Sequence, residues 1–325
     1  MRTKILLLAI LLFPLLYISF CNQKKTPKNN SSAFPLSLKD YGLFDGPIKR
    51  LQPSRNVFSY QLSSALFTDY TEKQRLIRLP RGKMIQVDKS SALSFPEGTI
   101  IAKTFYYPKS GKEGRIMETR ILERINGSWA AATYKWNESQ DDARLVTKGE
   151  NVPVTFKDTK DREWKTAYRI PSTKDCGTCH QKSGTMVTIG PELANLNRMV
   201  AGKDGKPVNQ LQIMQALGFL KLGKGSKIAE GLPAYFDNKN SLEKRARAYL
   251  KINCAHCHNP GGFASAQTIS LDYSTTLSAS GLLLHRKPIP ERMKIMGQYH
   301  MPKLGTTLPD VEGIDLIEEY LKSLP

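Results

Sequence analysis

The chain has 325 residues, enough for two or three domains, and its 40% hydrophobic and 24% charged residues are typical of soluble globular proteins. A net charge of +19 can indicate a nucleic acid, an anionic membrane or an acidic partner. The lysines and arginines are spread along the chain, without a dense cluster or a nucleic-acid-binding motif. We therefore expect solvated basic faces and no nucleic-acid partner.

The first 21 residues have the pattern of an export signal: a short basic start, an apolar run from Ile5 to Phe20, and Cys21. The apolar run is short for a membrane-spanning helix. The segment resembles a bacterial lipoprotein signal, in which the cysteine becomes the acylated first residue, although Phe20 stands where a small residue is usual. We expect lipidation at Cys21 and an exported protein, in the periplasm or anchored to a membrane of the bacterial cell envelope. A simple cleaved signal and an uncleaved anchor remain open.

Residues 22–38 are polar and typical of a tether. Residues 39–170 then contain short runs rich in β-branched and aromatic residues, separated by Gly, Pro, Asn and Asp. These runs are "GKMIQV", "GTIIAKTFYYP", "RIMETRILERI", "SWAAATYKWN", "NVPVTF" and "EWKTAYRIP". Their number and spacing predict a β-rich domain of the sandwich or small-barrel type.

After Pro171 the pattern becomes helical, so the expected fold class is multi-domain α+β, with a mainly α-helical region after the β-rich domain. We assign residues 171–240 to a first cysteine-containing segment and 241–325 to a second domain. In that domain "SLEKRARAYLKIN" and "PDVEGIDLIEEYLKSL" have apolar residues at helical spacing. The first of these helices runs directly into Cys254.

Two copies of the motif Cys-x-x-Cys-His carry most of the chemistry. They consist of Cys176, Cys179 and His180, and of Cys254, Cys257 and His258. The chain has five cysteines, of which the fifth is Cys21 at the signal. An idle thiol tends to be oxidised outside the cytoplasm, so each of these cysteines should have a role.

The four motif cysteines could form a tetrahedral zinc site, or each pair could form a disulfide. Histidine is rare in this chain, with 5 of 325 residues, yet it follows both pairs directly. Cys-x-x-Cys-His is the attachment motif of c-type haem. Two thiols on one helical turn bond the vinyl groups of the porphyrin, and the next residue offers its imidazole to the iron. We therefore expect covalent haem c at both motifs, two per chain.

The second motif has further support from Met301-Pro302, which lies just ahead of the terminal helix. This arrangement resembles the class I cytochrome c domain, in which a helix leads into the motif, a loop supplies a methionine, and a C-terminal helix crosses the first. The resemblance implies that His258 and Met301 are the axial iron ligands of the second haem, a pairing that raises the reduction potential. It also implies packing of Tyr249 and Leu250 against Ile317, Tyr320 and Leu321. Competing sixth ligands are Met293, Met296 and His300.

The first motif offers His180 as an axial ligand, but no Met-Pro loop follows it. Met199 and Met214 are candidates for the sixth position, although both lie in apolar helical stretches where core packing is the simpler interpretation. Met186 is close to His180 in sequence, so it is poorly placed to reach the other face of the haem. His256 could approach the first haem if the motifs pack together, but an exposed position is the simpler expectation. An open sixth position is therefore an alternative.

With both motifs in place, the chain resembles an uncharacterised family of exported bacterial diheme c-type cytochromes. The resemblance rests on segments such as "SALFTDYTEKQRLIRLPRGKMI", "FPEGTIIAKTF", "IPSTKDCGTCH", "RARAYLKINCAHCH" and "MPKLGTTLPDVEGIDLIEEYL", and spans about residues 35–325. It implies two haems but says little about function.

Two hypotheses follow for a chain of this kind. In the first, it carries electrons at the cell envelope, with a redox partner protein that the basic face predicts to be acidic. In the second, it is a redox enzyme of peroxidase, oxidase or dehydrogenase type, which needs an open first haem with acid–base groups above it. The long β-rich region ahead of the first motif argues against the peroxidase arrangement, so we favour the carrier.

Overall fold

The computed structural model describes residues 34–108, 114–226, 228 and 230–325. The expected signal with Cys21, and most of the expected tether at 22–38, lie outside these residues. The last five tether residues belong to the folded protein: Phe34 packs against a hydrophobic core, and the Ser37 hydroxyl donates to the Asp142 carboxylate. A short 3-10 helix, η1 (Leu38–Tyr41), begins at the last of them, and a second, η2 (Ile48–Arg50), follows.

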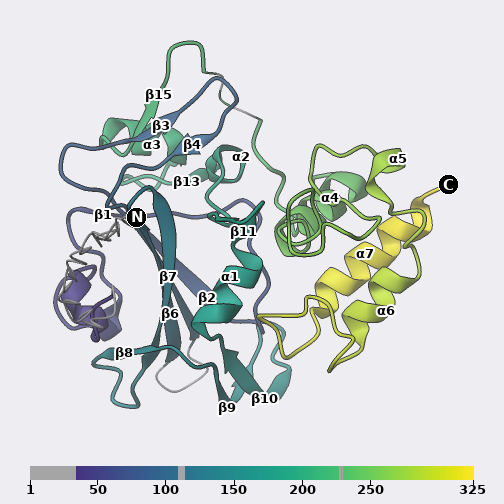
Figure 1. Ribbon diagram of the computed structural model, residues 1–325, viewed down its shortest axis with the longest axis horizontal. Helices are drawn as coiled ribbons and strands as arrows, with labels where there is room; N and C mark the ends of the chain where they lie inside the picture. The colour runs from purple at the N-terminus through teal and green to yellow at the C-terminus, as the bar shows by residue number, and fades with distance from the viewer. Residues whose placement is uncertain (1–33, 109–113, 227, 229) are drawn as a thin grey trace, which may run out of the picture. The chain divides into compact units, whose positions relative to one another are not determined.

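The largest element is a six-stranded antiparallel sheet (Figure 1). Its strands, in spatial order, are β1 (Val57–Ser59), β2 (Glu72–Arg78), β5 (Ile100–Tyr107), β6 (Arg115–Ile125), β7 (Ser128–Trp136) and β8 (Ala143–Val146). The order β1-β2-β5-β6-β7-β8 makes β1 and β8 the two edges of an open sheet. The β-rich N-terminal region is thus confirmed.

The two faces of this sheet support two separate cores, because successive side chains along a strand point to opposite sides. One face contributes Leu76, Ala102 and Ile121 to a core that η1 and η2 help to close. The other face contributes Ile77 and Ile101 to a second core. That second face is the one against which the first motif lies.

Four smaller sheets complete the strand inventory of the described residues. A hairpin joins β9 (Glu150–Lys157) to β10 (Glu163–Ile170), and β3 (Ile85–Val87) pairs with β4 (Leu93–Ser94) and, in parallel, with β15 (Leu220–Leu222). Two short ladders are formed by β11 (Gln181–Lys182) with β12 (Thr185–Met186), and by β13 (Met199–Ala201) with β14 (Pro207–Asn209). All six runs expected to be strands are therefore strands.

The segment 171–240 is mixed rather than helical. It contains the short helices α1 (Thr173–Cys179), α2 (Leu193–Leu196) and α3 (Gln210–Ala216) together with β11 to β15. Leu193, Leu211 and Met214 belong to the same core as Ile77 and Ile101 of the sheet. The segment is therefore packed onto the β-rich region, and the expectation of a mainly helical chain after Pro171 is not met there.

Residues 241–325 contain four helices: α4 (Leu242–Asn253), α5 (Leu277–Ser280), α6 (Pro288–Lys294) and α7 (Val311–Ser323). Helices α4 and α7 begin at side-chain caps, since Ser241 accepts from the Lys244 N–H and Asp310 from the Gly313 N–H. They pack together (Figure 1), with Gly313 against the ring of Tyr249. The expected contact set, Tyr249, Leu250, Ile317, Tyr320 and Leu321, shares one core, which confirms the predicted helix pair.

The loop before α7 is held by the β-rich region. The buried Asp69 carboxylate accepts hydrogen bonds from the Thr307 N–H at 2.7 Å, the Thr307 hydroxyl at 2.7 Å and the Leu308 N–H at 3.0 Å. Arg162, at the start of β10, pairs with Glu312 of α7 at 2.7 Å. These contacts fix residues 307–312 against the β-rich part of the chain. Among the described helices, none is long and apolar enough to cross a bilayer.

Candidate functional site

The first motif is built by α1. A capping box starts this helix, because the Ser172 hydroxyl accepts from the Asp175 N–H while the Asp175 carboxylate accepts from the Ser172 N–H. The helix is one residue too short to include His180, whose N–H still donates to the Cys176 carbonyl at 2.9 Å. Cys176 and Cys179 are consequently one helical turn apart, and His180 caps the end of the helix.

The His180 ring is fixed by a hydrogen bond from Nδ1 to the Val187 carbonyl at 2.9 Å. A backbone carbonyl on Nδ1 is the usual partner of a metal-binding histidine, because it leaves Nε2 free and sets the orientation of the ring. Burial, with the neighbouring charge of Lys103, lowers the pKa of His180 to about 3. The ring is therefore neutral, which is the form that binds iron.

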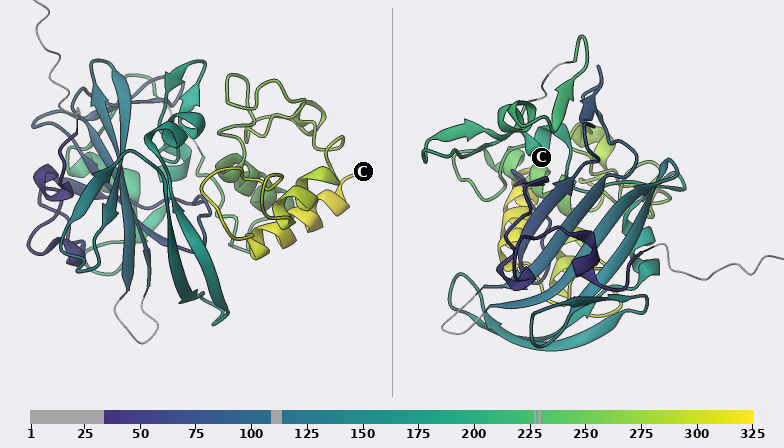
Figure 2. Two further views of the ribbon diagram at one scale, coloured as in Figure 1. Left: turned by 60° about the horizontal axis from the view of Figure 1, so that its bottom comes forward. Right: turned by 90° about the vertical axis from the view of Figure 1, so that its left-hand side faces the viewer.

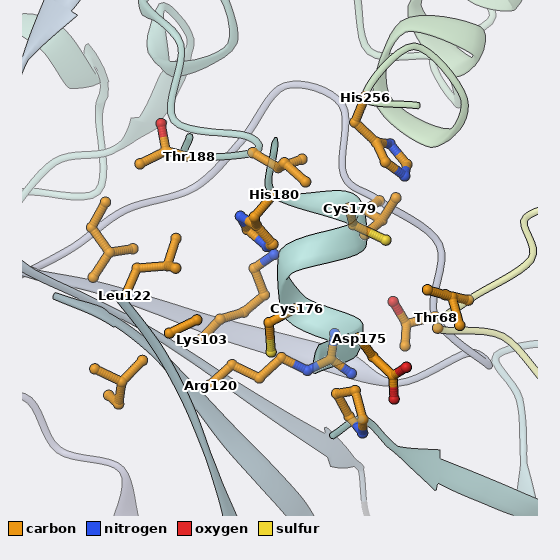
Figure 3. Close-up of a pocket in the computed structure, with 18 of the residues that line it drawn as sticks. Thr68, Lys103, Arg120, Leu122, Asp175, Cys176, Cys179, His180, Thr188 and His256 are labelled. Atoms are coloured by element: carbon orange, nitrogen blue, oxygen red, sulfur yellow. The ribbon is translucent and has the colours of Figure 1, made fainter. Parts of the chain in front are cut away.

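A cavity lies between α1 and the sheet (Figure 3). Cys176, Cys179 and His180 line it from the helix, and Lys103 and Arg120 reach into it from β5 and β6. The loop before α7 closes it with Pro302, Leu304, Gly305 and Thr306. Helix α1 packs against β7 of the sheet, where the Sγ of Cys176 lies 3.9 Å from the Thr133 hydroxyl. The backbone of the sheet and of the short helix on it can be followed in Figure 2.

Lys103 is the unusual group in this cavity. Burial and the charges of Arg75 and Arg120 lower its pKa to about 7. Lys103 and Arg120 were not predicted as site residues, because "AKTFYY" and "METRILER" contain isolated charges that look like ordinary solvent-facing positions. The pairing of β5 with β6 places both side chains on the sheet face that α1 covers, and this strand register could have indicated them.

The second motif follows α4 directly. The N–H groups of Cys257 and His258 both donate to the Cys254 carbonyl, at 3.1 and 2.9 Å. The motif is therefore a tight turn at the end of the helix. Burial raises the pKa of the Cys254 thiol to about 12. The Nδ1 of His258 is buried and makes no hydrogen bond within the described residues. Among the described residues, His258 therefore lacks the carbonyl partner on Nδ1 that orients the ring of His180.

Of the candidate sixth ligands near the second motif, His300 is the one that the structure disfavours. Its Nδ1 lies 2.8 Å from the Ile295 carbonyl and its Nε2 lies 3.0 Å from the Thr306 hydroxyl, so both ring nitrogens are occupied. Met293 is buried in the helical core. The N–H of Met301 donates to the Arg292 carbonyl, and the charge of Arg292 is one of those that lower the pKa of His258. These contacts do not place Met301 beside His258, and its role as a ligand stays a prediction.

The two motifs meet. The ligand atoms of Cys179, His256 and Cys257 all lie within 4.8 Å of one another. The backbone reinforces this contact, since the Ser183 N–H in the turn between β11 and β12 donates to the Gly261 carbonyl at 2.8 Å. His256 is half-buried with an orphaned Nδ1, so the simpler expectation of an exposed residue was wrong. It also lines the first cavity (Figure 3).

The cysteine arrangement bears on the alternatives to haem. The four described cysteines form no disulfide. The cluster that could hold a metal contains Cys179 and Cys257 but neither Cys176 nor Cys254. A tetrahedral site with four sulfurs is therefore not assembled, whereas a three-donor site made of two sulfurs and an imidazole is geometrically available.

None of the methionines considered for the first haem lines the cavity. Met214 is fully buried in the second core of the sheet, Met186 packs against that same core, and the side chain of Met199 is 54% exposed. The described lining residues that carry a nitrogen able to bind iron, beyond the motif histidine, are Lys103 and His256. Comparison of the chain with family models, with curated proteins and with solved structures found no match to any of them.

Proposed function

We propose that the protein is an exported diheme c-type cytochrome that relays electrons at the cell envelope. In this proposal the cysteines of each motif form thioether bonds to one haem c, and His180 and His258 are the axial ligands beneath the two irons. Met301 is the sixth ligand of the second haem. The haems supply reversible one-electron chemistry, and the chain supplies ligation, burial and docking.

The local geometry of both motifs supports this proposal. Cys176 and Cys179 are one helical turn apart and share a cavity with a neutral histidine whose Nε2 is free. At the second motif, a helix runs into the cysteines, a loop carries Met301, and a terminal helix packs against the first. Residues 241–325 contain helices and no strand, which fits the proposed cytochrome c-like domain.

The observation that carries the relay is the contact between the motifs. The Sγ atoms of Cys179 and Cys257 are within 4.8 Å of each other, although 77 residues separate them in the sequence (257 − 179 − 1). Haems bound through these two sulfurs would be neighbours at that edge. Electrons could therefore pass from one to the other inside a single chain, without a diffusional encounter.

The net charge of +19 suggests the nature of the partner. A basic surface steers encounters with an acidic protein, and this steering weakens as ionic strength rises.

For the expected export signal, we propose lipidation at Cys21, which would hold the folded part near a membrane. Residues 39–170 would then serve as a docking and scaffold domain, 171–240 as the first haem segment and 241–325 as the second haem domain.

The decisive experiment is to express the full chain with the machinery for c-type haem maturation and measure its intact mass. We expect the mass of the mature chain plus two haems, with metal analysis showing two irons and no zinc. Stopped-flow reduction should then show that one haem is reduced by the external donor and the other by intramolecular transfer, at a rate independent of donor concentration. A protein without porphyrin that carries zinc at Cys179, His256 and Cys257 would overturn the proposal.

A redox enzyme is the second candidate, and the first cavity favours it. The described lining of this cavity includes Lys103 and His256 but no methionine, although Pro302, the residue after Met301, is part of it. The discriminating measurement is the spin state of the ferric protein with and without cyanide. A high-spin haem that binds cyanide and turns over hydrogen peroxide would favour the enzyme, whereas two low-spin haems inert to both would favour the relay.

A further inference from the structure

A row of three cations crosses the face of the six-stranded sheet that α1 covers. In the strand register, Arg75 of β2 lies directly opposite Lys103 of β5, and Lys103 lies directly opposite Arg120 of β6. Like charges in directly opposed positions of an antiparallel sheet repel each other. A buried sheet face is therefore an unfavourable place for such a row unless an anion compensates it.

The row is short of negative charge. Arg75 is 9% exposed, and its Nε makes no hydrogen bond within the described residues. Arg120 pairs with the fully buried Glu118, which also accepts from the Tyr168 hydroxyl at 2.7 Å. Lys103 has no hydrogen bond or ion pair to any described residue; its ammonium lies 5.8 Å from the centre of the Phe105 ring. Because uncompensated charge is costly to bury, a further anion would stabilise the row with Lys103 charged.

The row lies beside the first motif. On the neighbouring strand β7, Thr133 lies directly opposite Arg120 and so continues the row. The Thr133 hydroxyl is 3.9 Å from the Sγ of Cys176. Lys103 and Arg120 point from the sheet into the cavity that Cys176, Cys179 and His180 line (Figure 3). The preceding row, Ile77, Ile101 and Leu122, is apolar. The cavity thus has one apolar wall and one cationic wall.

We propose that the row Arg75, Lys103 and Arg120 compensates the two propionate carboxylates of the haem attached at Cys176 and Cys179, with Lys103 and Arg120 lining the haem cavity and Arg75 beside Lys103 outside its lining. This inference rests on the proposed function. Strands are about 4.8 Å apart, so Lys103 lies about 10 Å and Arg75 about 14 Å along the row from Thr133. The vinyl edge of a porphyrin, which the cysteines hold, is opposite its propionate edge. The carboxylates would therefore lie toward the end of the row that is farthest from Thr133, near Lys103 and Arg75. Their two negative charges would compensate these two cations, because Glu118 pairs with Arg120.

The pairing gives the β-rich region a role in the redox chemistry. Cations next to a haem stabilise its ferrous form, which carries one positive charge fewer than the ferric form. The row would therefore raise the reduction potential of the first haem more than that of the second, whose motif follows α4. Arginine suits this position because its planar fork binds a carboxylate through two hydrogen bonds.

The test compares Lys103→Gln and Arg75→Gln with the wild-type diheme protein by spectroelectrochemical titration of each haem. We expect each substitution to shift the equilibrium of the first haem toward the ferric form at least tenfold, about 59 mV for one electron. Resonance Raman bands of propionate bending should change at the same haem. Lys103→Arg should restore both properties, and Lys165→Gln, at a position whose side chain is 76% exposed on β10, should alter neither.

The results of these titrations distinguish failure of the propionate assignment from failure of the proposed diheme function. Two attached haems with an unchanged first potential and unchanged propionate bands in both variants would overturn the inference and leave the relay intact. A wild-type chain with haem at the second motif alone would instead overturn the diheme function. The row could also bind a free carboxylate beside the haem. Added acetate would then shift the reduction potential of the first haem in the wild type but not in Lys103→Gln. This result would also overturn the assignment to propionates.

Discussion

The two motifs have the same spacing but are embedded in different surroundings. The first is on a helix of seven residues laid against a sheet, next to a cavity with a cationic wall. The second follows a helix of twelve residues and belongs to a core of helical side chains. Identical local chemistry is thus placed in a polar and in an apolar setting. If both motifs carry haem as proposed, this difference would give the two haems unequal reduction potentials.

The two motifs also depend on different parts of the chain for their structural support. The buried core beside the second motif lies within residues 241–325, and the motif also contacts Cys179 and Ser183 of the first segment. The first depends on strands that precede it by 40 to 100 residues and on the loop at 302–306 that follows it. Damage to the β-rich region should therefore affect the first site more than the second. The following predictions address this asymmetry, beginning with the largest effect.

Removing the cysteines of each motif should have the largest effect and should separate the two regions. The double substitution Cys254→Ala with Cys257→Ala should remove one haem from the intact mass and lower the helical signal in circular dichroism, since Cys254 packs against the helical core. The matched pair Cys176→Ala with Cys179→Ala should also lose one haem but keep its helical signal. Equal loss of helical signal in both variants would show that the two motifs contribute equally to the stability of the helices.

Asp69→Ala should weaken the attachment of the loop before α7 to the β-rich region. The substitution leaves the Thr307 and Leu308 N–H groups without their charged acceptor, and we expect the free energy of unfolding to fall on the order of 3 kcal/mol. Urea unfolding measures this change. Asp45→Ala, at an exposed carboxylate, is the control and should be close to neutral. An equally small effect at Asp69 would mean that the contact does not hold the loop.

Met301→Ala should act on the second haem alone. We expect loss of the far-red sulfur-to-iron band and a lower second potential, because the thioether stabilises the ferrous state. The spectrum of the first haem should stay as it is. Met296→Ala, whose side chain is 44% exposed five residues earlier, should keep the band. If the band survives in Met301→Ala but disappears in Met296→Ala, the ligand assignment is wrong.

Asp158→Asn should give the smallest effect, and one that depends on pH. Burial alone would raise the pKa of Asp158, but hydrogen bonds from the side chains of Trp164 and Arg162 and from two backbone N–H groups outweigh it and hold the pKa well below 3.8. A carboxylate with a depressed pKa contributes stability that is complete above the unfolded value of 3.8 and is lost as the pH falls below it.

Unfolding of wild type and Asp158→Asn should therefore be compared at neutral pH and at about pH 3. We expect the wild type to be more stable at neutral pH and the difference to shrink in acid. Asp158 lies in the β9–β10 turn, where Arg162 also pairs with Glu312 of α7, so the variant should loosen the second region slightly. A difference that grows in acid would contradict the depressed pKa.

Strands and helices with a regular apolar pattern could be predicted from the sequence. All six expected β runs are strands, and the α4–α7 pair forms the expected core. Strand β2, by contrast, was not recognised, because Lys73, Gln74 and Arg75 give polar residues on both faces in succession. Tertiary structure overrides that pattern by covering one of these faces with α1 and its cavity. The same burial explains why no pattern identified Lys103 and Arg120.

The sequence by itself determined the two motifs and the helices and strands that carry them, since these depend on spacing over a few residues. Only the tertiary structure decided that Cys179, His256 and Cys257 meet, and that Arg75, Lys103 and Arg120 align across three strands. Such contacts join segments far apart in the chain. They arise from strand register and core packing, which the local periodicity of a sequence does not specify.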